Sequence, residues 1–180
     1  MSYKTVKLSE ICTIEKGVTG ITKAIEGEYP MVTMAEARTS HNEYQFDAKA
    51  VLIPLVSSSG HGHASMKRIH YQEGKFAIGS ILCALIPKNE DEVNALFLYN
   101  YLNFQKETLL VVPLMRGAAN VSLSIKSISS VEINLPPVEI QKELINQLEI
   151  VNELRSQIEK SLIDVNILER VIMRDFLRNS

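Results

Sequence analysis

Apolar and polar positions follow two different patterns along the chain, and the change falls near Pro136 and Pro137. After the prolines, apolar side chains recur at seven-residue intervals, which is the pattern of a helix in a coiled coil. Two series make up this seam, one uninterrupted and one with two charged positions. The seam consists of Leu144, Val151, Ile158, Val165 and Ile172 in the first series and of Leu148, Arg155, Leu162, Glu169 and Phe176 in the second.

The segment that carries the seam is predicted to be one continuous helix. Pro137 suits the first helical turn, where its missing N–H is not needed, and neither glycine nor proline occurs from Val138 to Ser180. A helix of about 40 residues is roughly 60 Å long. Residues 1–136 would form a domain only about 35–40 Å across, so we expect a partner helix to cover the seam, which Leu154 and Leu168 widen.

The two charged positions of the seam indicate how two copies of the helix would pair. In a parallel homodimer Arg155 would face its own copy, and so would Glu169, which is unfavourable for like charges. In an antiparallel pair centred between Leu162 and Val165, Arg155 lies within about one turn of the partner's Glu169. We therefore predict an antiparallel homodimer. Another protein, or part of the chain's own domain, is the alternative cover for the seam.

Residues 1–136 show shorter patterns that predict an α+β fold, a mixed α/β domain with an irregular sheet. Apolar runs predict strands at 31–34, 50–56, 64–71, 80–87 and 131–135, with one more after a turn at Glu73 and Gly74. Pro54 indicates an edge or an irregularity in its strand. Short helices are expected at 10–13, after Ser9 as N-cap, and at 125–129. A longer helix is expected between residues 90 and 110, with one side formed by Val93, Leu96, Phe97, Asn100, Tyr101 and Phe104.

Composition refines this picture without changing it. Apolar residues make up 46% and charged residues 22% of a chain with a net charge of −2, which is typical of a soluble globular protein. No apolar run reaches the roughly 20 residues of a membrane helix, and the start has no signal-peptide pattern, so we expect a cytoplasmic protein. Cys12 and Cys83 are expected to be buried, reduced thiols.

Basic residues gather in two stretches that could lie on one face of the domain. Between residues 51 and 89 the single acid is Glu73, whereas lysine, arginine and histidine recur. From 108 to 131, Arg116 and Lys126 occur without any acid. A nearly neutral chain can therefore still offer a cationic surface to nucleic acid.

The stretch SSSGHGHAS, residues 57–65, is the most suggestive local motif. It lacks the Gly-x-Ser-x-Gly frame of a nucleophile elbow and the Gly-Lys-Ser of a phosphate-binding loop. His61 and His63 have no cysteine or carboxylate at metal-ligand spacing. Two interpretations stay open: a polar loop between strands, or a loop that contacts DNA phosphates and base edges. The segment MRGAANVSLS, residues 115–124, allows the same two, as a connector or as a second contact loop.

Two further motifs bear on enzymatic functions. Glu73 and Lys75 have the Glu-x-Lys spacing of some nuclease metal sites but no acidic partner, and a tight turn is the simpler interpretation. The Pro-Pro motif of adenine methyltransferases needs Asn or Asp directly before the prolines and an aromatic residue after them, but Leu135 and Val138 occupy these positions. We therefore expect no catalytic residue, no cofactor and no metal site.

Four segments occur in a characteristic order: VKLSEICTIEKGVTG at the start, residues 56–89, MRGAANVSLSIKSISSVEINLPP, and LPPVEIQKELINQL. In this order they resemble the specificity (S) subunits of type I restriction–modification systems. The last segment is similar to the LPP-x-x-x-Gln signature of the family's spacer helix, although Ile140 stands where members usually have Glu. The resemblance covers essentially the whole chain.

The resemblance implies an architecture and a set of partners. Such a subunit normally carries two target recognition domains, each followed by a long helix, and the helices pack antiparallel as a ruler. Each domain reads half of a bipartite site in double-stranded DNA, methyltransferase subunits dock on the subunit, and a translocase/nuclease subunit can join. With one predicted domain (1–136) and one spacer and dimerisation helix (137–180), this chain resembles a half-subunit. Its homodimer would read a palindromic, interrupted site.

The resemblance also places candidate DNA contacts at 17–23, in the loop 57–63 with the basic residues Lys67, Arg68 and Lys75 after it, and at 116–122. Lysines and arginines there are expected to fix the DNA backbone, whereas serines, histidines and Asn120 are candidates for base contacts. The candidates are Lys23, Ser57, Ser58, Ser59, His61, His63, Lys67, Arg68, Lys75, Arg116, Asn120 and Ser122. Two competing functions are a coiled-coil assembly or decoy protein that binds methyltransferase subunits without reading DNA, and a nuclease.

Overall fold

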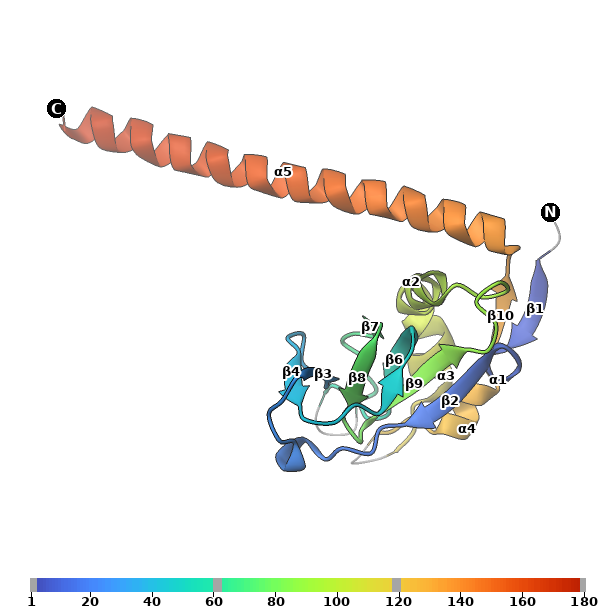
Figure 1. Cartoon of the computed structure of the whole chain (residues 1–180). Helices are drawn as coiled ribbons and strands as arrows, with labels where there is room; N and C mark the ends of the chain where they lie inside the picture. Colours follow the sequence, from blue (N-terminus) through green and yellow to red (C-terminus); the bar gives the residue numbers. More distant parts are fainter. Residues whose placement is uncertain (1–2, 60–62, 118–120, 179–180) are drawn as a thin grey trace. The chain divides into compact units, whose positions relative to one another are not determined.

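The computed structural model describes residues 3–59, 63–117 and 121–178. Contacts divide the chain into a globular unit, Met1–Gln141, and a helical unit, Lys142–Ser180. The described part of the globular unit contains three β-sheets and several short helices, and the helical unit contains most of one long helix (Figure 1).

Two four-stranded sheets form the centre of the globular unit. The first sheet is antiparallel, in the order β2 (Cys12–Lys16), β9 (Leu82–Pro87), β6 (Ala50–Pro54) and β7 (His70–Gln72). The second is mixed, with β3 and β8 parallel, in the order β4 (Thr39–His41), β3 (Tyr29–Val32), β8 (Lys75–Ile78) and β5 (Phe46–Asp47). A separate antiparallel pair joins β1 (Lys4–Lys7) to β10 (Glu132–Leu135).

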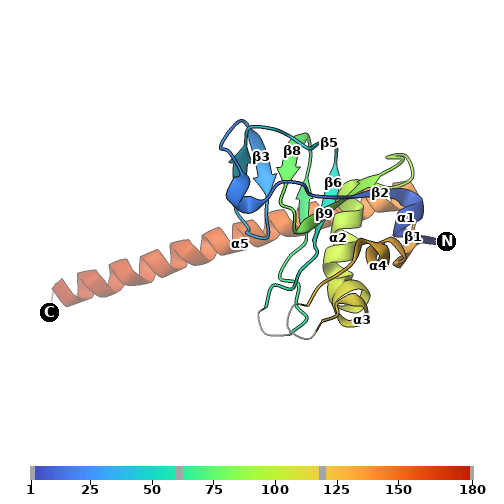
Figure 2. The ribbon, with the colours of Figure 1, turned by 90° about the horizontal axis from the view of Figure 1, so that it is seen from below.

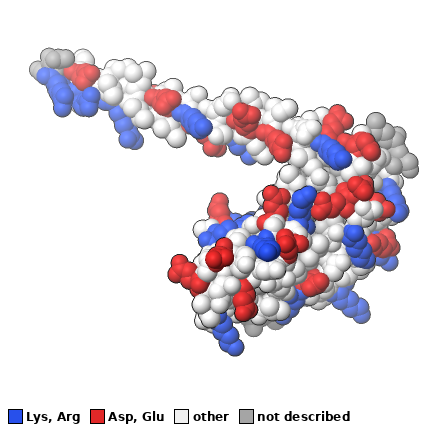
Figure 3. Space-filling model, in the orientation of Figure 1, with Lys and Arg blue, Asp and Glu red and all other residues white. Residues whose placement is uncertain are grey.

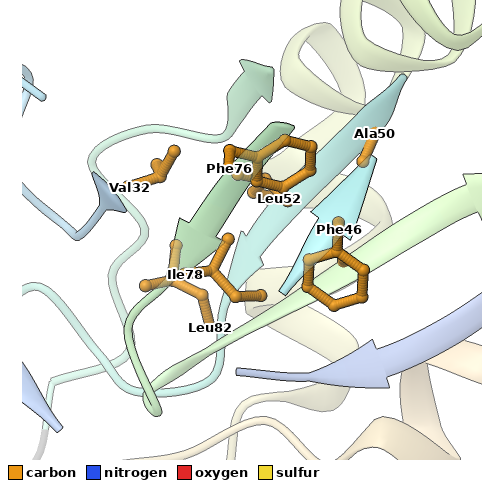
Figure 4. Packing of buried hydrophobic residues seen from close by; sticks show 8 residues of the cluster. Val32, Phe46, Ala50, Leu52, Phe76, Ile78 and Leu82 are labelled. Carbon is orange, nitrogen blue, oxygen red and sulfur yellow. The ribbon is translucent and has the colours of Figure 1, made fainter. Parts of the chain in front are cut away.

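The apolar core lies where strands of both four-stranded sheets meet. Phe46 and Phe76 lie opposite each other across β5 and β8, with ring centroids 5.5 Å apart. Figure 4 shows their neighbours converging from strands of the two sheets. Burial of one large apolar side chain contributes about 1.5–3 kcal/mol, so this cluster holds the two sheets together. Its members are Val32, Phe46, Ala50, Leu52, Phe76, Ile78, Leu82 and Ala84.

One longer helix packs on the first sheet. α2 (Ala95–Lys106) contacts β6 and β7 and continues through the π-helical turn η2 (Glu107–Val111) into α3 (Val112–Leu114). Asn94 is the N-cap of this helix. Its side-chain oxygen accepts hydrogen bonds from the N–H groups of Leu96 and Phe97. The remaining short helices of the described globular unit are α1 (Leu8–Ile11), η1 (Ile21–Lys23) and α4 (Ile125–Ser129).

Most predicted strands are confirmed within a few residues, and so is the helix at 125–129. Pro54 is accommodated although β6 is a central strand, because β7 pairs with it only as far as Leu52. The strand predicted at 64–71 is wrong for most of its length. The N–H groups of Ser65 and Lys67 donate to serine hydroxyls of the preceding loop, and such local bonds replace the bonds of a sheet.

The first helix begins earlier than predicted, at Leu8 rather than after Ser9, and Thr13 already lies in β2. Its start is stabilised by the Lys7 N–H, which donates to the Glu10 carboxylate at 3.1 Å. Ser9 therefore lies inside the helix and is not its N-cap. The buried side chains of Leu8 and Ile11, one turn apart, fix this register.

The apolar side predicted for the longer helix is only partly right. Val93 and Phe97 are buried, but the deepest side chains of α2 are Leu98 and Leu102, and Phe104 is 87% exposed. Nearly every residue from 95 to 102 is apolar or aromatic. Spacing alone therefore does not define which side of the helix faces the sheet.

The long C-terminal helix predicted from the sequence is confirmed. α5 runs without interruption from Val138 to Arg178. The large apolar side chains of the seam are exposed, from 40% for Leu144 to 68% for Ile158. Figure 3 shows charged side chains of both signs along α5 with uncharged surface between them. The described part of the helical unit is a single helix, so it contains no second element to cover the seam.

Gly17 marks a close backbone approach inside the globular unit. A Cβ atom there would overlap the carbonyl oxygen of Gly79 and lie 2.7 Å from that of Ile78. We expect Gly17→Ala to lower the free energy of unfolding by about 1–3 kcal/mol, because backbone atoms must move apart. Urea unfolding measures the change. Gly20→Ala is the matched control, since its nearest atoms lie 3.8 Å away in the Lys23 side chain; equal midpoints for the two variants would contradict the steric conflict.

Candidate nucleic-acid interface

Two loops meet at one end of the globular unit. The first loop, described at residues 55–59 and 63–69, joins β6 to β7, and the second loop, described at 115–117 and 121–124, joins α3 to α4. The Ser57 N–H donates to the Val121 carbonyl at 2.9 Å, and Arg116 and Ser122 exchange backbone hydrogen bonds as in a hairpin. Figure 2 shows the described parts of the two loops side by side, and we call these parts the loop pair. The structure thus unites two segments that the sequence indicated separately.

Two serines of the first loop hold its described parts together. The Ser57 hydroxyl donates to the His63 carbonyl at 2.6 Å and accepts from the N–H groups of Ser59 and Ser65. The Ser58 hydroxyl accepts from the Lys67 N–H at 2.9 Å. These hydroxyls stabilise the loop, because they satisfy backbone groups that have no place in a sheet. Ser59, His63 and Ser122 are exposed on the loop pair.

The basic side chains at the loop pair differ in the hydrogen bonds and ion pairs that they make within the protein. Lys67 is exposed, and its ammonium group makes no ion pair with any described residue. The Lys106 ammonium group, from the end of α2, donates to the Lys67 carbonyl at 3.0 Å. The sequence did not predict a role for Lys106, because no pattern near residue 106 indicates a contact with residue 67, which lies 39 positions earlier. Lys67 and Lys106 are therefore neighbouring cations at the loop pair.

Arg116 has a structural role that its sequence position did not indicate. Its guanidinium group donates to the carbonyl oxygens of Val112, Pro113 and Met115, at 3.1, 2.6 and 3.0 Å. These carbonyls end the α3 helix, where positive charge is favourable. The side chain is exposed, but its donors are largely used by the protein itself.

Arg68 belongs to a charged network that joins β7 to the loop before β4. Its guanidinium group pairs with the Glu36 carboxylate at 2.8 Å. Beside it, Arg38 donates to the Gln72 side chain at 3.0 Å and contacts His70 Nδ1 at 3.2 Å. Arg68 is thus committed to an ion pair within the protein, which reduces its availability for a DNA phosphate.

His70 is the buried member of this network. Because Nδ1 faces an arginine donor, the ring is neutral with its proton on Nε2, an atom without a hydrogen-bond partner among the described residues. Burial, followed by the positive charges of Arg38 and Arg68, lowers the pKa of His70 to about 4.

The other predicted site residues lie elsewhere or outside the described residues. Lys75 begins β8 in the second sheet, with its ammonium group 4.9 Å from the Tyr44 ring centroid, and Lys23 ends η1. Figure 2 places β3 and β8 at the opposite end of the view from the loop pair. His61 and Asn120 lie outside the described residues.

Metal and thiol chemistry find little support in the described parts of the chain. No group of three or more His, Cys, Asp or Glu residues is placed to hold a metal ion in those parts. Cys12 and Cys83 are buried free thiols, and desolvation raises the pKa of each to about 12. Among the described residues, no helix has the length and hydropathy needed to span a membrane.

The seam on α5 is the second candidate site. All ten predicted seam positions are exposed on one continuous helix, and Leu154 and Leu168 lie exposed beside them. Neither Arg155 nor Glu169 forms an ion pair with another described residue. The helix therefore presents an uncovered apolar stripe with two opposite charges inside it.

Comparison with known families identifies the class to which this domain and helix belong. The sequence pattern of the type I restriction modification DNA specificity domain matches residues 2–166. The chain therefore belongs to this family, which confirms the resemblance found in its motifs.

Two curated relatives come from Mycoplasma pneumoniae, and both carry the name of a type I specificity subunit. One is 29% identical over 171 residues, covering 91% of this chain and 44% of the relative. The other is 26% identical over 149 residues, covering 79% and 45%. The chain thus spans about half the length of the curated relatives it matches.

Solved structures share the fold. The S subunit of a type I restriction–modification system from M. genitalium matches with a TM-score of 0.64 and 16% identity, over 85% of this chain and 40% of that one. The HsdS subunit from Thermoanaerobacter tengcongensis matches with a TM-score of 0.60 and 21% identity, over 85% and 38%. The fold is thus a mixed α/β target recognition domain followed by a long helix, as predicted.

The lowered pKa of His70 predicts a pH dependence of stability. Between pH 6.5 and about 4 the unfolded chain binds a proton at this residue and the folded chain does not. The free energy of unfolding should therefore fall as the pH is lowered through this range, by about 3 kcal/mol from this group. Urea unfolding of the wild type and of His70→Gln, from pH 7 to pH 4, measures the difference. Parallel pH profiles for the two proteins would exclude a neutral, buried His70.

Proposed function

We propose that this chain is the DNA specificity subunit of a type I-like restriction–modification system and reads DNA through the loop pair. The observation that carries the proposal is the meeting of two polar loops and the cations Lys67 and Lys106 at one end of a domain of the specificity family. Lysines at such an end would fix the DNA backbone, whereas exposed Ser59, His63 and Ser122 would meet base edges. In this role the chain itself carries no catalytic group.

We also propose that two copies form the complete reading device. One domain and one helix correspond to about half the length of the curated relatives. A second copy would supply the other domain and would cover the exposed seam of α5. A two-fold symmetric dimer presents the same loops twice, so its target would be a palindromic site interrupted by a spacer.

Charge along α5 favours the antiparallel arrangement of the two helices. The first part of the helix, residues 138–154, carries Glu139, Glu143, Glu149 and Glu153 against Lys142. The last part, residues 170–178, carries three arginines against one aspartate. Antiparallel packing brings the acidic part of one helix beside the basic part of the other, and it brings Arg155 near the partner's Glu169.

The partners of such a dimer follow from its family. Methyltransferase subunits would dock on it and modify adenines at the recognised site, and a translocase/nuclease subunit would join them. A decoy that occupies these subunits without reading DNA is the second candidate, favoured by the net charge of −2 and by the internal engagement of Arg68 and Arg116. Salt-dependent retention of a random DNA library by the purified chain, with and without a methyltransferase partner, separates the two.

The cations of the loop pair give the first test of DNA reading. We expect Lys67→Ala to weaken binding to all sequences alike, because it removes a cation that neutralises a phosphate and leaves the base-reading side chains in place. Lys106→Ala should also weaken binding, but it removes in addition the hydrogen bond to the Lys67 carbonyl. The slope of log affinity against log salt should become shallower by about 0.9 for each phosphate that is no longer neutralised. Fluorescence anisotropy with a selected DNA duplex measures both effects. Lys4→Ala, in β1, is the control, and an equal loss of affinity in that variant would argue against the loop pair.

A charge exchange tests the antiparallel dimer. Arg155→Glu and Glu169→Arg should each weaken dimerisation by about tenfold, because each places like charges together twice in the dimer. The double exchange should restore it. Sedimentation equilibrium at low and high salt measures the dissociation constants. In a parallel dimer each residue would face its own copy, so the single exchanges would have little effect and no restoration would occur.

A further inference from the structure

Gln141, in the first turn of α5, is the last residue of the globular unit and one of its most deeply buried side chains. Its side-chain amide bridges two other segments of that unit. Oε1 accepts from the Asn94 N–H at 2.9 Å, and Nε2 donates to the carbonyls of Glu92 and Pro136, each at 2.8 Å. One amide therefore joins the start of α5 to the turn after β10 and to the loop before α2.

The three partners of this amide match a glutamine side chain. They comprise one N–H donor and two carbonyl acceptors, and a glutamine amide supplies one acceptor and two N–H donors. A glutamate at this position could not donate to the carbonyls when ionised, and an apolar side chain would leave all three groups unpaired in a buried site. The side-chain amide of the exposed Gln157, in contrast, donates to the Glu153 carboxylate of its own helix at 3.5 Å.

Asn94 extends the bridge to a second helix. Its backbone N–H binds Gln141, while its side chain caps the start of α2 through the N–H groups of Leu96 and Phe97. The first turns of α2 and α5 are thus tied to the same residue. Since α2 packs on β6 and β7, the start of α5 is connected through few bonds to the first sheet.

We propose that Gln141 is a positioning residue that limits bending where α5 leaves the globular unit, and so restricts the spacer lengths that the dimer accepts. This role rests on the proposed function, because a spacer exists only if two domains read one bipartite site. A tilt of about 10° moves a point 35 Å away by about 6 Å, which is close to two base pairs at 3.4 Å each. Even slight bending at the junction would therefore let the dimer accept spacers that differ in length by one or two base pairs.

The first experiment measures the bending without DNA. Spin labels are placed at Glu15→Cys in β2 and Glu153→Cys in α5, both exposed positions, and pulsed electron resonance gives the distance distribution. Buried Cys12 and Cys83 should not react with the label. Labelled chains are mixed with an excess of unlabelled chains to isolate distances within one copy. We expect a narrow distribution for the wild type and for Gln157→Met, and a broader one for Gln141→Met.

The second experiment measures spacing on DNA. Selection from a library with fixed half-sites and variable spacers should return one dominant length for the wild type. In Gln141→Met the preference for that length over its neighbours should fall by about tenfold, the ratio that corresponds to one net hydrogen bond. Binding to a single half-site should be unchanged, because the loop pair is untouched.

The outcomes separate the two proposals. A folded Gln141→Met protein with the wild-type distance distribution and spacer preference overturns the role of Gln141 and leaves DNA reading intact. A wild type that selects no bipartite site overturns the proposed function, whereas the distance distribution still decides whether Gln141 limits bending. If Gln141→Met does not fold, Gln141→Asn is tested in its place, because its amide lies one methylene farther from the three partners. A distance distribution as narrow as that of the wild type would then overturn the role.

Discussion

The long apolar stripe on α5 is the constraint on which the rest of this protein depends. A helix of 41 residues can satisfy its own backbone, but it cannot bury a stripe that runs along its whole length. The seam positions are all exposed, and two of them are opposite charges, Arg155 and Glu169. The stripe is therefore available to a covering partner. In the proposed dimer a second copy of the helix covers it, and the two charges favour antiparallel pairing.

The loop pair illustrates how side chains of a candidate binding surface hydrogen-bond to its own backbone. Backbone groups in the first loop that lack sheet partners are bound by the hydroxyls of Ser57 and Ser58, and Arg116 caps the end of a helix. Side chains used in this way hold the shape of the loops, whereas the Lys67 ammonium group makes no ion pair with any described residue. This division explains why a basic or polar residue near a candidate site is not by itself evidence of contact with DNA.

Sequence patterns predicted some elements better than others, for physical reasons. The absence of glycine and proline after Pro137 and the seven-residue spacing predicted α5, because helix continuity and side-chain spacing depend on near neighbours in the chain. The segment 64–71 alternated like a strand, but N–H groups of its backbone donate to the hydroxyls of Ser57 and Ser58 in the same loop. The helix at 95–106 was predicted, but not the side that faces the sheet, because apolar residues lie all around it. At the candidate site, the two loops were identified separately, and Lys106 was missed.

The sequence by itself determined the family of the chain, the length of its C-terminal helix and the positions of the seam residues. These follow from motifs and from the spacing of near neighbours. Only the tertiary structure decided which polar groups are used internally. The ion pair of Arg68 with Glu36, the neighbouring lysines Lys67 and Lys106, and the amide bridge of Gln141 all join residues far apart in the chain. Such partners are selected when the sheets and loops pack together, because a hydrogen bond or ion pair needs both groups within a few ångströms.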